Sequence, residues 1–139
     1  MEDSIKKELF VKTVRKWQAT EADSRERIEE LMKRVKSPLI TTTLDIMKQN
    51  SARHKALLQI IIDTTEDKED FVDLAELADL TSTFRDHLAV ENRMIHLASH
   101  TYESSKQNIV QYITSFIIAD EKKNNEMLNK LLSLAEVKT

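Results

Sequence analysis

The sequence contains no glycine, no cysteine and only one proline, Pro38. Tight β-hairpin turns depend on glycine, so its absence argues against a fold of many short strands. Without cysteine the chain forms no disulfide and no thiolate metal site. No apolar run approaches the roughly 20 residues that a membrane span needs, so we expect no membrane partner. These absences leave an all-helical protein as the prediction.

Aromatic residues make up only 5% of the 139 residues, whereas charged residues make up 32%. This balance is typical of long helices in a small bundle, and the length suits a single domain over residues 1–139. The net charge of −3 gives no reason to expect nucleic acid as a partner. Residues 1–11 are charged and do not resemble a signal peptide, so we expect a cytoplasmic protein.

Four segments carry an apolar stripe with alternating steps of three and four residues, which predicts four helices packed in a bundle. The stripes cover residues 10–35, 40–61, 80–101 and 110–134. Ser37 and Pro38 suit the start of the second helix as cap and first residue, and residues 103–105 form a second break. The short breaks predict two antiparallel hairpins, over residues 4–63 and 79–136. Between them we expect a long crossover, residues 64–78, that carries the chain back along the bundle.

A gapless shift of 70 residues superposes the two predicted hairpins. The polar interruptions of the stripes coincide under this shift, because Glu21 falls on Glu91, Asn50 on Asp120, Ser51 on Glu121 and His54 on Asn124. With a rise of about 1.5 Å per residue, the polar residues of each hairpin reach a similar height. We therefore expect them to converge in one interior layer. Burying an unpaired carboxylate costs several kcal/mol, so the layer needs a metal, a shared proton, a hydrogen-bond network or water.

The pattern resembles the ferritin-like (di-iron carboxylate) superfamily over about residues 11–134. In that superfamily two helices each supply a Glu, and the other two each supply a Glu-x-x-His motif. Glu21 and Glu91 match the single glutamates. In the segment ADEKKNNEML (119–128), Glu121 matches the motif glutamate and Asn124 stands in place of the histidine.

In the segment NSARHKALL (50–58), His54 matches the motif histidine and Ser51 stands in place of the glutamate. The resemblance implies a ferritin-like four-helix bundle of two pseudo-symmetric hairpins. The metal-ligand candidates that it implies are Glu21, His54, Glu91 and Glu121, with Asp120 beside Glu121 and His87 one turn before Glu91. Such a set suits one Fe²⁺, Zn²⁺ or Mn²⁺ better than two irons. The alternative is a metal-free polar layer that fixes the register of the helices.

The function that these residues predict is that of a degenerate ferritin-like protein, with no catalytic residues and at most one bound metal. The rival hypothesis is a helical interaction module that forms a homo-oligomer, most simply a dimer. The run LLQIII (57–62) supports it, because this run is apolar nearly all round. A third alternative, an active di-iron oxidase, requires two irons. His96 and His100 have a metal-like spacing but lie off the apolar stripe, so we interpret them as surface residues that pick up adventitious metal.

Overall fold

The computed structural model describes residues 2–66 and 73–136, with side chains up to residue 134. This part of the chain forms four helices, α1 (Glu2–Met32), α2 (Pro38–Thr65), α3 (Leu74–Ser104) and α4 (Asn108–Glu136). It contains no strand, so the prediction of an all-helical chain with four helices is confirmed. Within these described residues, no helix is both long enough and apolar enough to cross a membrane.

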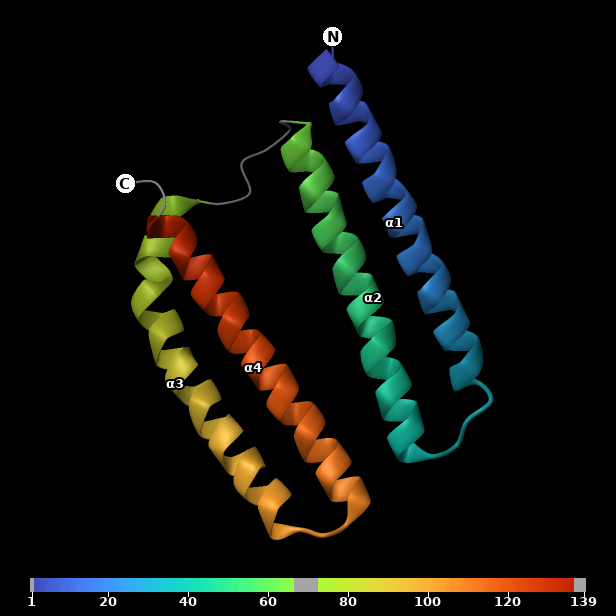
Figure 1. Cartoon of the computed structure of the whole chain (residues 1–139), viewed down its shortest axis with the longest axis vertical. Coiled ribbons are helices and arrows are strands. Elements are labelled where there is room, and N and C mark those ends of the chain that lie inside the picture. The colour runs from blue at the N-terminus through green and yellow to red at the C-terminus, as the bar shows by residue number, and fades with distance from the viewer. Residues whose placement is uncertain (1, 67–72, 137–139) are drawn as a thin grey trace. The chain divides into compact units, whose positions relative to one another are not determined.

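The first hairpin consists of α1 and α2, which are joined by residues 33–37 and lie side by side in opposite directions (Figure 1). The side chain of Ser37 caps α2 by accepting a hydrogen bond from the backbone N–H of Ile40, and Pro38 occupies the first turn. Near the middle of the hairpin, the Gln18 amide of α1 donates to Gln59 Oε1 of α2 at 3.1 Å. Ser37 and Pro38 therefore start the second helix as the sequence predicts.

The second hairpin consists of α3 and α4, which are joined by residues 105–107 and also lie side by side (Figure 1). Asp73 starts α3, since its Oδ1 accepts hydrogen bonds from the backbone N–H groups of Ala75 and Glu76 at 3.0 and 3.1 Å. The first residues of α2 and α4, Pro38 and Asn108, are separated by the 70-residue shift found in the sequence.

The connection between the hairpins is shorter than the predicted crossover. Residues 64 and 65 belong to α2 and residues 74–78 belong to α3, while residues 67–72 of the predicted crossover lie outside the described residues. Because Asp73 caps α3, this helix begins at Leu74 and not at residue 79, the predicted start of the second hairpin.

The buried core of each hairpin is a seam between its two helices. In the first hairpin, Val14 packs with Leu58 and Ile62, and Val11 lies against this cluster. In the second hairpin, the buried side chains include Leu77, Thr114 and Leu132. Each seam is narrow because only two helices contribute to it.

Within each hairpin taken by itself, the predicted core positions of the second and fourth helices are mostly exposed, so their burial in a core shared by all four helices stays a prediction. The exposed members define the outer stripes, which are Met47, Leu57 and Ile61 on α2 and Ile113, Ile117, Met127 and Leu131 on α4. The buried positions lie one residue further along, for example at Leu58 and Ile62. A bundle helix turns one flank to its hairpin partner and the other outward, and apolar periodicity does not distinguish the two flanks.

Candidate functional site

In the first hairpin, Glu21 of α1 and His54 of α2 form a polar pair across the seam. The Nδ1 atom of His54 lies 3.0 Å from Oε2 of Glu21, and the Trp17 indole N–H donates to the same oxygen at 3.1 Å. The Glu21 side chain is 14% exposed, whereas that of His54 is 53% exposed. The carboxylate is therefore held in the hairpin while the imidazole remains half in solvent. The sequence predicted correctly that these two residues share one height.

One turn along the same seam, two serines occupy the place where a metal motif needs a carboxylate. Ser51 is buried, and its Oγ donates to Ser24 Oγ at 3.5 Å, which is a weak hydrogen bond. Asn50, the neighbour of Ser51, is half-buried. A serine hydroxyl does not provide the negative charge of a glutamate ligand, so this hairpin brings together only two of the predicted ligands, Glu21 and His54.

In the second hairpin, Glu91 of α3 is the most deeply buried charged group, with 3% of its side chain exposed. Its Oε1 lies 3.1 Å from Nε2 of His87, which is one turn earlier on α3 and half exposed. Under the 70-residue shift, His87 corresponds to Trp17, and each ring nitrogen contacts the glutamate four residues later. This shared contact was missed in the sequence, although the coincidence of two aromatic rings under the shift is a signal that could have revealed it.

Glu121 of α4 approaches Glu91 across the second seam. A hydrogen bond with Glu91, burial, and the negative charges of Glu91 and Asp120 raise the pKa of the Glu121 carboxyl, while the nearby His87 opposes this shift. When both carboxyl groups are ionised, the buried Oε2 atoms of Glu91 and Glu121 have no hydrogen-bond partner among the described residues. A proton on Glu121 would supply a donor to Glu91, which is the direction in which its raised pKa acts.

The neighbouring polar residues of α4 divide between the seam and the solvent. The Asn125 amide donates to Asn92 Oδ1 at 2.8 Å, which adds a second polar contact across the seam one turn from Glu121. Asp120 instead lies 3.9 Å from Lys123 and has 45% of its side chain exposed. Asn124, at the place of the motif histidine, is half-buried. Asp120 therefore adds charge near Glu121 but belongs to the hairpin surface.

The predicted site residues thus form one polar cluster in each hairpin, Glu21 with His54 and Glu91 with Glu121 and His87. Within residues 2–66 and 73–136, no group of three or more His, Asp or Glu side chains is arranged to hold a metal ion. The structure describes each hairpin by itself, so the single layer expected from all four helices stays a prediction.

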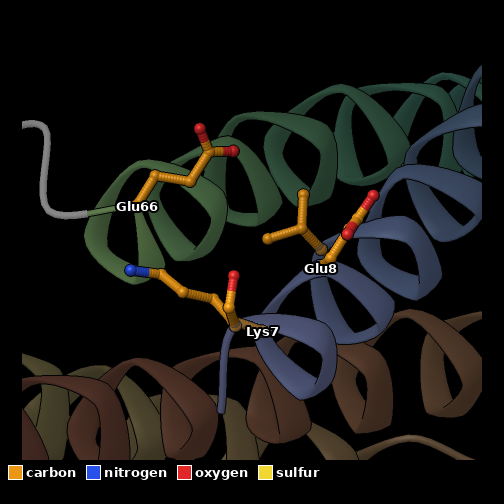
Figure 2. Close-up of a pocket in the computed structure, with 5 residues that line it drawn as sticks. Lys7, Glu8 and Glu66 are labelled. Carbon is orange, nitrogen blue, oxygen red and sulfur yellow. The ribbon is translucent and has the colours of Figure 1, made fainter. Parts of the chain in front are cut away.

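A separate hollow of about 310 Å³ lies at the open end of the first hairpin. Lys7 and Glu8 of α1 and Glu66 after α2 line it, together with Ser4 and Val11 (Figure 2). Glu66 also lies 3.6 Å from Arg15. The hollow is bordered mainly by long charged side chains, and none of the predicted metal-ligand candidates contributes to it.

The chain matches no protein-family model, no curated protein and no solved structure. The resemblance to the ferritin-like superfamily therefore rests on the sequence motifs alone. Any function must be inferred from the two polar clusters and from the exposed apolar surfaces beside them.

Proposed function

We propose that the chain is a helical structural module that assembles with a second copy of itself through its outer stripes. The observation that carries this proposal is the exposure of large apolar side chains at regular helical spacing. Leu57 on α2 is 55% exposed, and Met127, its equivalent under the 70-residue shift, is 57% exposed. Ile61 and Leu131 are a second equivalent pair. Each chain therefore carries two equivalent outer stripes, one on α2 and one on α4.

The physical reason for assembly is the free energy of covering apolar surface. Removing such surface from water is worth roughly 25 cal/mol per Å², and an amphipathic helix is stable only when its apolar stripe packs on another element. Within one hairpin, the two helices cover one flank of each other, and the outer stripe has no partner in that hairpin. A symmetric dimer suits this arrangement, because a two-fold axis places the same surface of each copy in the contact.

The buried polar pairs fit this structural role as devices that set the register of the helices. A polar residue at a seam position disfavours alternative registers, at some cost in stability. Glu21 finds its partner His54 only when α1 and α2 have the observed offset, and Glu91 finds Glu121 in the same way. In this proposal the polar layer contains no metal.

The experiment that tests the assembly compares two adjacent isoleucines of α2. Ile61 lies in the outer stripe and is 38% exposed, while Ile60 points to another side of the helix and is 40% exposed. We expect Ile61→Glu to weaken dimerisation about 100-fold, since it removes about 1.5–3 kcal/mol of apolar burial and adds a charge. Ile60→Glu should leave the dimer intact. Sedimentation equilibrium over a range of concentrations measures both constants.

The wild-type chain should then show a mass of twice 16.1 kDa. A wild-type protein that stays monomeric at all concentrations would contradict the proposal. Equal weakening by Ile60→Glu and Ile61→Glu would also contradict it, because the contact would then not follow the outer stripe.

A second candidate function is the binding of a single Fe²⁺, Zn²⁺ or Mn²⁺ ion between the carboxylates of Glu91 and Glu121. It is supported by the buried oxygens of the two carboxylates, which lack a donor when both groups are ionised. A divalent cation can take the place of the shared proton there. Added metal should then raise the melting temperature of the protein, because it binds the native state. Glu121→Gln should abolish this rise, and the exposed control Glu126→Gln should retain it. Melting temperatures that do not change with any of the three metals would exclude this candidate.

A further inference from the structure

The last turns of α3 carry two exposed histidines, His96 and His100, on the side of the helix that does not face α4. Each residue turns the helix by about 100°, so both lie far around the helix from Glu91, whose buried side chain marks the seam. His96 lies at least 100° around the helix from the exposed apolar residues Met94 and Leu97, whereas His100 is three residues after Leu97 and neighbours it. Contacts along the seam would therefore leave both imidazoles accessible.

The spacing of the two histidines places both rings within reach of one ion. Residues four apart on a helix are separated by about 6 Å along the axis and have Cβ atoms about 5–6 Å apart. This spacing is the one by which two histidines on a helix bind zinc in metalloprotease motifs. His54 and His87 are each paired with a glutamate. The imidazole rings of His96 and His100 have no partner among the described residues.

Both signs of charge lie near this place, since the exposed Arg93 is three residues before His96 and the negative groups are at the end of α3. The α-helix ends at Ser104, and its last turn contains no basic residue. The carbonyl groups at a helix C-terminus carry a partial negative charge that stabilises a nearby cation. Glu103 is exposed and lies three residues after His100, so its carboxylate is on the same side of α3. These features place negative charge near His100.

We propose that His96 and His100 form a two-histidine surface site for one late first-row divalent cation, with water in the remaining positions. Imidazole ligands select Cu²⁺, Ni²⁺ and Zn²⁺ over Mg²⁺, and affinity at a given site is highest for Cu²⁺. The site does not depend on the proposed assembly or on the buried Glu91–Glu121 pair. It reinterprets the two histidines, which the sequence alone suggested to be adventitious binders.

The test is calorimetric titration of the full chain with Cu²⁺, Ni²⁺, Zn²⁺ and Mg²⁺. We expect one ion per chain for Cu²⁺, weaker binding of Ni²⁺ and Zn²⁺, and no binding of Mg²⁺. Loss of even an outer-shell partner of a metal ligand costs about 10- to 100-fold in affinity, so His96→Ala and His100→Ala should each weaken Cu²⁺ binding at least as much. The matched controls His54→Ala and His87→Ala should bind Cu²⁺ as the wild type does.

A second variant separates spacing from histidine count. The double substitution His100→Ala with Leu97→His keeps two histidines in the segment but places them side by side in sequence, about 100° apart around the helix. It should lose the site, since adjacent residues do not face each other. Cu²⁺ binding that survives in this variant, or that weakens equally in all four single histidine variants, shows adventitious binding and overturns the proposal. Binding that is lost only in Glu121→Gln overturns it too and assigns the metal to the buried pair.

Discussion

Replacing Ile62 by alanine is expected to lower the free energy of unfolding by about 2–5 kcal/mol. Ile62 is the only side chain of the described residues that is fully buried, and it packs against Val14 and Leu58 across the seam of α1 and α2. The substitution removes buried methyl and methylene groups and leaves a cavity. Because the cluster is small, this single loss should affect a large part of the stability of the first hairpin. Urea unfolding followed by far-UV circular dichroism measures the change.

Ile60 provides the matched control for this prediction. It has the same side chain two positions earlier on α2 but is 40% exposed. Ile60→Ala should change the free energy of unfolding by no more than about 0.5 kcal/mol, the usual range for surface positions. Equal destabilisation by both substitutions would show that the seam between α1 and α2 is not where this helix obtains its stability.

Replacing both Glu91 and Glu121 by leucine is expected to raise the free energy of unfolding at neutral pH by about 1–4 kcal/mol. The wild-type pair places two carboxyl groups at a seam between helices, with buried oxygens that share one donor at most. Apolar residues of similar volume remove the cost of burying these charges. The polar pair would then be retained for register, and not for stability. The same urea titration measures the gain.

The gain should depend on pH in a direction that follows from the raised pKa of Glu121. A carboxyl group with a raised native pKa binds more protons in the folded state than in the unfolded state between its ordinary pKa and its native pKa. Through this group, wild-type stability therefore increases as the pH falls across that interval. The leucine variant lacks the group, so its advantage over the wild type should be largest above the native pKa and should decrease toward the ordinary value of 4.5.

Two results would contradict this account of the buried pair. One is a difference between variant and wild type that does not change with pH, because the shared proton would then play no part. The other is a similar gain from Glu126→Leu, a substitution on an exposed face of α4 where Glu126 pairs with Lys130 at 2.9 Å. That outcome would point to helix propensity as the cause, and not to the removal of buried charge.

Several features of the fold follow directly from the sequence, because their causes are local. The lack of glycine and the three- and four-residue apolar steps predicted helices. Ser37 and Pro38 predicted the start of α2, since a cap and a first-turn proline act through the nearest backbone groups. The pairing of Glu21 with His54 was also predictable, because the helical rise and a short turn fix which residues of a hairpin share a height.

The sequence alone also determined that polar groups would interrupt the apolar stripes at equivalent places in the two halves. Only the tertiary structure decided which flank of each stripe is buried, and it placed Ile62 in the seam while leaving Ile61 in the outer stripe. It also decided that Glu91 meets both His87 and Glu121. Periodicity records that a helix has an apolar side, but the exact direction of that side depends on the rotation of one helix against its partner. That rotation is set by the packing of both helices together, which neither segment encodes by itself.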